Sequence, residues 1–223
     1  MREVVLDTET TGLDVETGHR LVEIGCVELV NHLATGKVYH TYINPNRDIP
    51  EEAIKIHGLS EEFLREHPTF AELSDDFLGF IEDSPLIIHN ADFDLKFINL
   101  ELKIIGYELL PRERAVDTMI MARCKFPGSP VSLNALCRRF NINSTMRSKH
   151  GALLDAELLA NVYFELIGGS EPELDLNLAK KKTDFIKQRH IRHPRSYSLS
   201  ETELLEHEKF CKNKLKNSLW LVK

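Results

Sequence analysis

An apolar run that ends in two alternating acids, close to the amino terminus, constrains the fold more than any other stretch. The segment Val4-Val5-Leu6-Asp7-Thr8-Glu9-Thr10-Thr11-Gly12 predicts a strand buried on both faces that ends in a turn. Side chains alternate faces along a strand, so Asp7 and Glu9 project to the same side with α carbons roughly 6.6 Å apart. Two carboxylates on a rigid strand end favour a metal site, although polar residues that cap the next element would give the same triplet.

The rest of the body predicts a hairpin followed by alternating strands and helices. Leu21–Val30 and Lys37–Ile43 have the composition of antiparallel strands, separated by a loop that contains Gly36. Helices are predicted over 50–56, from 61, after the capping box at 69–72, over 93–104, 118–126, 132–140 and 151–167, and strands over 85–88 and 115–116. This order indicates an α/β fold in which helices flank one mixed sheet.

Composition excludes membrane and disulfide-rich classes. Hydrophobic residues make up 42% of the chain and charged residues 28%, a balance typical of globular proteins. No apolar segment is long enough to span a bilayer and no signal peptide precedes the first strand, so we expect a cytoplasmic protein that makes no membrane contact. The four cysteines are scattered without a C-x-x-C pair, which argues against a disulfide framework or a cysteine zinc site.

Charge is unevenly distributed along the chain. Residues 1–170 carry a net charge of −11 and residues 171–223 carry +4, within a total of −7. An acidic body repels phosphates at long range unless cations or a tethered partner offset the repulsion. The charge therefore argues against a free-standing nucleic-acid binder.

Two more acids and one histidine fall where the predicted topology brings them toward the same strand end. Asp94 lies in a first helical turn, and Asp155 lies in the last helix of the body, so four carboxylates including Asp7 and Glu9 can converge. Carboxylate oxygens select Mg²⁺ or Mn²⁺ over zinc, and several are needed to hold two dications. His150 precedes the last helix, where a neutral imidazole can accept a proton from an attacking water. These residues predict a metal-dependent phosphodiesterase.

Each of these residues also has a simpler explanation. First-turn acids such as Asp94 and Asp155 favour a helix amino terminus without any metal, and an isolated loop histidine is most often a solvated side chain. Spacing does not choose between Asp92 and Asp94. It neither establishes nor excludes a metal role for Asp117 at the end of a strand.

Three segments together resemble the DEDDh family of 3′→5′ exonucleases: Asp7-Thr8-Glu9-Thr10-Thr11-Gly12, His89-Asn90-Ala91-Asp92-Phe93-Asp94 and His150-Gly151-Ala152-Leu153-Leu154-Asp155-Ala156. Their order, context and spacing agree with that family, and the combination is specific although each segment alone is not. The resemblance implies a ribonuclease-H-like fold and a 3′ nucleic-acid end as substrate. It also implies two Mg²⁺ or Mn²⁺ ions held by Asp7, Glu9, Asp94 and Asp155, with His150 as the general base.

Over nearly the whole chain the resemblance extends to the epsilon, or proofreading, subunits of bacterial DNA polymerase III. Ile56-His57-Gly58-Leu59 and Ser132–Cys137 look like stretches shared by that group. The group implies removal of mispaired nucleotides from a single-stranded or frayed DNA primer. It makes His57 a candidate substrate contact, with an exposed turn histidine as the alternative. The full set of substrate-binding candidates is Asp7, Glu9, Thr10, His57 and Asp155.

The carboxyl-terminal part predicts an extension of the body. We expect an exonuclease domain over 1–170, a linker over 171–197 that is rich in Lys, Arg and His, and a tail over 198–223. The tail has a helical pattern and contains the only tryptophan, Trp220, and the resemblance implies that it docks on the alpha subunit of the polymerase. The theta subunit and the sliding clamp are further candidate partners. Residues 169–176 resemble a clamp-binding peptide, with a proline-containing acidic linker as the alternative.

Two other functions remain alternatives. A stand-alone RNA-trimming exonuclease of the same family needs its own basic binding surface, which argues against it in a body of charge −11. A non-catalytic scaffold that only stabilises the polymerase would be favoured if one of the four acids were missing, and none is.

Overall fold

The computed structural model describes residues 1–143, 150–169 and 198–215, and the chain divides into two units, Met1–Glu173 and Leu174–Lys223. The strands are β1 (Arg2–Thr10), β2 (Leu21–Val30), β3 (Leu33–Tyr42), β4 (Leu86–Ile88) and β5 (Ala115–Asp117). The helices of the first unit are η1 (Val15–Thr17), α1 (Glu51–His57), α2 (Glu61–Arg65), α3 (Phe70–Ile81), α4 (Ala91–Ile104), η2 (Arg112–Arg114), α5 (Thr118–Lys125), α6 (Leu133–Arg139) and α7 (Ala152–Leu166). The second unit contains α9 (Glu201–Lys214).

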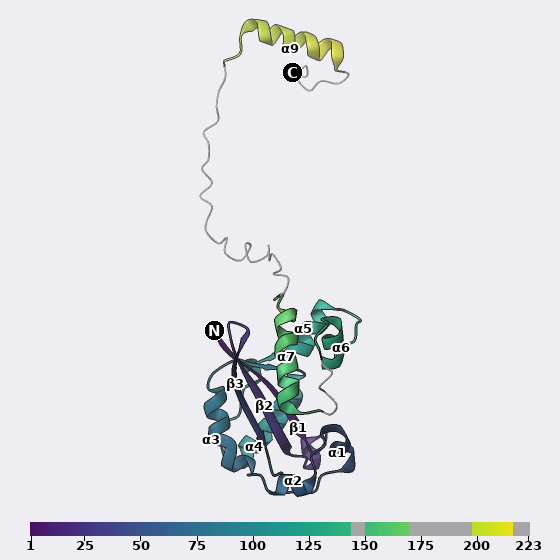
Figure 1. Cartoon of the computed structure of the whole chain (residues 1–223). Coiled ribbons are helices and arrows are strands. Elements are labelled where there is room, and N and C mark those ends of the chain that lie inside the picture. The colour runs from purple at the N-terminus through teal and green to yellow at the C-terminus, as the bar shows by residue number, and fades with distance from the viewer. Residues whose placement is uncertain (144–149, 170–197, 216–223) are drawn as a thin grey trace. The chain divides into compact units, whose positions relative to one another are not determined.

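The five strands form one mixed sheet in the order β3-β2-β1-β4-β5. Figure 1 shows β3, β2 and β1 side by side. β1 pairs antiparallel with β2, and β2 antiparallel with β3, whereas β4 lies parallel to β1 and β5 parallel to β4. Parallel strands need crossover connections, and α4 together with η2 supplies the one between β4 and β5. The predicted α/β fold with one mixed, helix-flanked sheet is confirmed.

Alternation along β1 divides the core into two layers. Val4 and Leu6 pack in a cluster with side chains of α3 and α4, while Val5 packs in a second cluster with side chains of α5, α6 and α7. All three side chains have no exposed surface. Burial of each stabilises the fold by about 1.5–3 kcal/mol relative to exposure. β1 is therefore held rigidly from both faces, up to the acids at its end.

The hairpin between β2 and β3 differs from the sequence prediction. The tight turn lies at Asn31 and His32, which have positive φ angles of 52° and 67°, and β3 begins at Leu33. Gly36, expected in the connecting loop, instead lies within β3 at a φ of 87°, beside an irregularity in the β2–β3 register. Two consecutive left-handed residues match the twist of the flanking strands, so the turn closes before the glycine is reached.

Local capping signals predicted the helix starts correctly. Glu72 accepts a hydrogen bond from the backbone N–H of Thr69 at 2.8 Å at the start of α3, and Ser132 caps α6 by accepting from the N–H of Ala135 at 3.3 Å. In the second unit, Ser200 caps α9 in the same way. Among the described residues, no helix combines the length and apolar character that crossing a membrane requires. The predicted linker, most of the clamp-like segment and Trp220 lie outside the described residues.

Candidate active site

The two strand-end acids lie on the face of the sheet that α7 covers. Asp7 pairs with Gly25, and Glu9 with Glu23, across the β1–β2 ladder, whose register shifts directly after Glu9. Both Asp7 and Glu9 are partly buried. Because Gly25 has no side chain, the start of α7 lies against β2 beside Asp7, where a Cβ would come within 2.3 Å of the carbonyl carbon of Ala152.

The first turn of α7 brings a histidine and an acid to these carboxylates. Gly151, in extended conformation, is the N-cap, and its carbonyl accepts the first helical hydrogen bond from Asp155 at 2.9 Å. The backbone N–H of His150 donates to the carbonyl of Ile56 at 3.2 Å, so the backbone of His150 is held against α1. His150 Nδ1 lies 3.3 Å from Asp155 Oδ2. Ligand atoms of Glu9, His150 and Asp155 all lie within 4.8 Å of one another.

Asp94 reaches the same region from the first turn of α4. Its side chain is buried, and its Oδ1 accepts a hydrogen bond from Thr8 Oγ1 at 2.7 Å. Burial raises the pKa of the Asp94 carboxyl to about 7, against the opposing effect of the Thr8 hydroxyl and of backbone N–H groups. Thr8 thus joins the opposite face of β1 to the helix that carries the fourth acid.

The predicted catalytic residues line one cleft of about 270 Å³. Asp7, Glu9, Asp94, His150 and Asp155 all contribute to its wall. The remaining lining residues are Thr8, His89, Phe93, Met119, Ser132, Leu133 and Asn134. The structure therefore brings all five residues together from β1, α4 and the start of α7.

The donor set of this cleft fits divalent cations. Four carboxylates are hard oxygen ligands of the kind that Mg²⁺ and Mn²⁺ prefer. Two of the four, Asp94 and Asp155, are almost completely buried, which costs free energy for a carboxylate unless a positive charge lies nearby. An adjacent cation would lower the raised pKa of Asp94, since opposite charge favours the ionised form.

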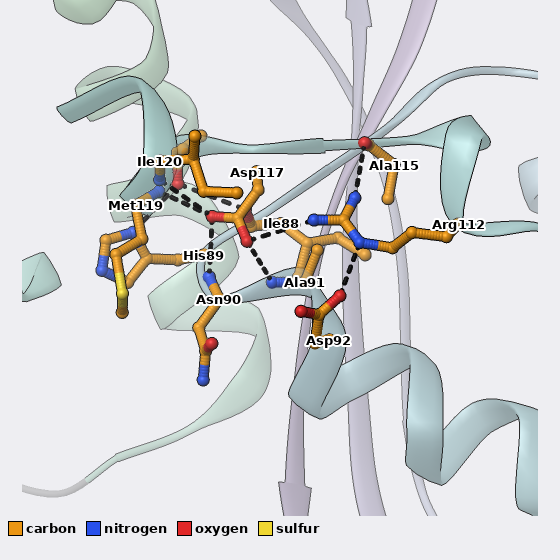
Figure 2. A network of polar contacts seen from close by, with 11 residues as sticks. Ile88, His89, Asn90, Ala91, Asp92, Arg112, Ala115, Asp117, Met119 and Ile120 are labelled. Atoms are coloured by element: carbon orange, nitrogen blue, oxygen red, sulfur yellow. Dashed lines mark hydrogen bonds and ion pairs between the residues drawn. The ribbon is translucent and has the colours of Figure 1, made fainter. Parts of the chain in front are cut away.

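Two acids that spacing alone does not assign, Asp92 and Asp117, are not among the residues that line the cleft. Asp92 is exposed, and its Oδ1 lies 2.5 Å from Nε of Arg112, which holds it away from the cleft. Asp117 accepts hydrogen bonds from backbone N–H groups at the starts of both α4 and α5 (Figure 2). Asp94, which the resemblance selects over Asp92, lines the cleft, and its role as a metal ligand stays a prediction.

A second cleft, of about 360 Å³, adjoins the first and shares Thr8, Glu9 and Phe93 with it. His57 and Thr10, both predicted to contact substrate, line this second cleft. The alternative of an exposed turn histidine is wrong, because His57 is only 6% exposed and its Nδ1 accepts from the N–H of Leu59 at 3.0 Å. The hydroxyl of Thr10 donates to the carbonyl of Gly12 at 2.6 Å and shapes the turn after β1.

Sequence reasoning missed several residues of the two clefts. The sequence pattern does not single out Thr8, which lies between the two acids and faces the opposite side of the sheet, yet its hydroxyl donates a hydrogen bond to Asp94. The alternation of side chains along β1 is the signal that could have identified Thr8, because it places Thr8 on the face of the sheet that α4 covers. Phe93 and Asn134 carry no such signal, because only the packing of α4 and α6 brings them to the cleft.

Comparisons with known proteins identify the family of the chain. The family model described as "Exonuclease" (RNase_T) matches residues 4–163. The DNA polymerase III subunit epsilon of Rickettsia felis is 46% identical, covering 98% of this chain and 99% of that protein. The corresponding subunit of Escherichia coli K12 is 43% identical, covering 75% of this chain and 72% of its own.

Solved structures share the fold. Exonuclease X in complex with 5′ overhanging duplex DNA is 25% identical with a TM-score of 0.58, covering 75% of this chain and 92% of its own. The nuclease domain of 3′hExo, a DEDDh family member bound to rAMP, is 16% identical with a TM-score of 0.65, covering 77% and 94%.

Proposed function

Since this chain belongs to the exonuclease family and, within it, to the DNA polymerase III epsilon subunits, we propose that it removes mispaired nucleotides from the 3′ end of a DNA primer. Family membership makes the chain a 3′→5′ exonuclease. The observation that carries the proposal is the convergence of four carboxylates and one histidine on a single cleft at the end of β1.

Asp7, Glu9, Asp94 and Asp155 would hold two divalent cations, Mg²⁺ or Mn²⁺. Bound there, the cations supply activation of a water and stabilisation of the leaving oxygen of a phosphodiester. The protein's own contribution is rigidity. β1 is buried on both faces, and Thr8 fixes the carboxylate of Asp94 through its hydroxyl.

His150 would act as the general base. With Nδ1 3.3 Å from Asp155 Oδ2, a proton on Nδ1 leaves the other ring nitrogen, Nε2, available to accept a proton from water. The hydrogen bond from its backbone N–H to the carbonyl of Ile56 fixes the backbone of the residue that carries the ring. Its exposed side chain is accessible to a nucleic-acid end, unlike the buried Asp155.

The adjoining cleft would receive the terminal nucleotide. Phe93 belongs to the walls of both clefts and offers an apolar surface beside Glu9. Ile56 and His57 of α1 and Leu13 after β1 form further parts of the wall. An apolar groove next to the acids favours an unstacked base, which is cheapest to obtain at a mispaired end.

Residues 1–170 would form the exonuclease domain, residues 171–197 a linker and residues 198–223 a tail that docks on the polymerase subunit. In support, α9 exposes Leu204, Leu205 and Phe210, each by more than half of its surface. Exposed apolar side chains on a short terminal helix favour a protein partner. A tether would keep the enzyme at the primer end despite the acidic body, through an effective concentration on the order of millimolar.

The test measures Mg²⁺-dependent release of nucleotides by the full chain from a DNA primer with a mismatched 3′ end, compared with an RNA primer of the same sequence. We expect release from DNA, abolished by Asp94→Ala and retained by Asp92→Ala. Asp92 is the matched control because it lies in the same helical turn but outside the cleft.

Near-normal turnover in Asp94→Ala, in a chain whose circular dichroism shows it folded, would contradict the ligand assignment. Faster trimming of RNA than of DNA would favour the stand-alone RNA exonuclease instead.

A further inference from the structure

Asp117 connects two helix starts through a single carboxylate. It is the last residue of β5, paired in register with Ile88 of β4, and its side chain is 7% exposed. Its Oδ1 accepts from the N–H groups of Met119 at 2.8 Å and Ile120 at 3.2 Å, at the start of α5. The same carboxylate accepts from Asn90 at 3.3 Å and Ala91 at 3.0 Å, at the start of α4 (Figure 2).

Helix α4 depends on this carboxylate because its own N-cap residue does not cap it. Asn90 has left-handed backbone angles, with φ at 69°, and its side chain makes no capping hydrogen bond. The first N–H groups of a helix have no partner within the helix, so an acceptor must come from elsewhere. Asp117 supplies that acceptor from a neighbouring strand, 26 residues from Ala91 in the sequence.

The turn of α4 that Asp117 holds is the one that carries Asp94. Ala91 is the first residue of the helix and Asp94 lies three residues later, so movement of the helix start moves the Asp94 carboxylate. A second contact supports the same arrangement, since His89 Nδ1 lies 2.9 Å from Oγ1 of Thr118, the first residue of α5. The connection from β4 to α4 is thus fixed against the start of α5 at two points.

Arg112 completes the network through contacts with Asp92, Asp117 and the backbone of Ala115. Its guanidinium lies 2.5 Å from Asp92 and 3.5 Å from Asp117, and it donates to the carbonyl of Ala115 at 3.0 Å (Figure 2). Its positive charge offsets the negative charge of the Asp117 carboxylate. With both oxygens of Asp117 accepting from N–H donors, the carboxylate acts as an anchor and not as a metal ligand.

We propose that Asp117 is a positioning residue, which fixes the first turn of α4 and thereby holds the Asp94 carboxylate in the geometry that binds metal. The inference rests on the proposed function in that Asp94 is taken as a ligand. Groups that orient ligands without touching the metal typically change metal affinity or activity by about 10–100-fold when altered.

The test compares Asp117→Asn with Asp92→Asn in the full chain. Asparagine caps helices as well as aspartate does, so its oxygen can keep the hydrogen bonds to α5, whereas its NH₂ group would face the N–H of Ala91. Asp92→Asn is matched, because it removes the same charge and also a partner of Arg112. Calorimetric titration with Mn²⁺, amide exchange at Ala91, and kcat and KM on single-stranded DNA are measured for each variant.

We expect Asp117→Asn to weaken Mn²⁺ binding by about 10–100-fold at unchanged stoichiometry, to lower kcat more than it changes KM, and to accelerate exchange at Ala91. Asp92→Asn should leave all three as in the wild-type chain. Wild-type Mn²⁺ affinity, kcat and Ala91 exchange in Asp117→Asn would overturn the positioning role. Loss of one bound Mn²⁺ at saturation would also overturn it, by making Asp117 a ligand.

Asp94→Asn separates this inference from the proposed function. If Asp94→Asn loses Mn²⁺ affinity and Asp117→Asn does not, only the positioning role fails. If Asp94→Asn binds Mn²⁺ like the wild-type chain, the proposed metal site fails, and with it the role of Asp117.

Discussion

Replacing Gly25 by alanine should displace the start of α7 and with it residues of the candidate active site. Gly25 lies opposite Asp7 in the β1–β2 ladder, and an added Cβ would lie 2.3 Å from both the carbonyl carbon of Ala152 and the backbone nitrogen of Leu153. Non-bonded carbon atoms pack at about 3.5–4.0 Å, so the start of α7 or the strand must move by about 1 Å or more. Neither contact is with a flexible side-chain end, so no rotamer change can relieve the clash.

This displacement should lower the catalytic rate, because His150 and Asp155 lie at the start of α7. Their ligand atoms and those of Glu9 lie within 4.8 Å of one another, a scale on which a shift of 1 Å matters. A misplacement of about 1 Å can cost about 10²-fold in rate. Overpacking of this kind costs about 1–3 kcal/mol of stability. We therefore expect Gly25→Ala to lower kcat by about 10²-fold in a chain that still folds.

Steady-state hydrolysis of single-stranded DNA and thermal unfolding check this prediction. Gly79→Ala is the control, because Gly79 lies within α3 and an added Cβ would meet nothing within 4 Å. That variant should gain about 0.5–1 kcal/mol of stability, since glycine is unfavourable within a helix, and keep its kcat. Wild-type kcat and Mn²⁺ affinity in Gly25→Ala would refute the view that the close approach of the α7 backbone to Gly25 determines the geometry of the site.

Three further predictions concern the base, the buried acid and the tail. His150→Ala should lower kcat by about 10²–10⁴-fold and retain Mn²⁺ binding in calorimetry; lost binding would make His150 a ligand. Without metal, burial raises the pKa of Asp94 from 3.8 to about 7, so the folded state binds the additional proton and stability should fall as pH rises through that window. Thermal unfolding with EDTA at several pH values should show this slope, and Asp94→Asn should reduce it. Truncation after residue 195 should retain hydrolysis of single-stranded DNA and lose co-elution with the polymerase subunit, whereas continued co-elution would argue against tail docking.

Features governed by local periodicity could be predicted from the sequence. The alternation of Val4, Val5 and Leu6 with the acids after them predicted both the buried strand and the shared face of Asp7 and Glu9, because side-chain direction in a strand has a period of two. Helix starts at Thr69 and Ser132 followed from capping residues, whose hydrogen bonds are local in sequence.

The position of the β2–β3 turn could not be predicted from composition. Gly36 was the stronger turn signal, but Asn31 and His32 form the turn, since the pairing of Val30 with Leu33 requires closure there. Register across β2 and β3 decides which residues take left-handed angles, and that register depends on the whole sheet. Gly36, with its positive φ, then lies inside β3 at an irregularity in the β2–β3 register.

The different roles of Asp92, Asp94 and Asp117 could not be predicted from the sequence. Burial and nearby hydrogen-bond donors decide these roles, and spacing along the chain does not. Asp92 is exposed and paired with an arginine, Asp117 accepts from the N–H groups of two helices, and Asp94 is buried with a pKa raised to about 7. Hydrogen-bond donors offset the cost of burial for Asp117, whereas for Asp94 burial outweighs the donors that reach it. Of these three carboxylates, Asp94 is therefore the one for which a nearby cation would lower the free energy most. Its position in the cleft is in turn set by Asp117, whose own charge is offset by Arg112 outside the cleft.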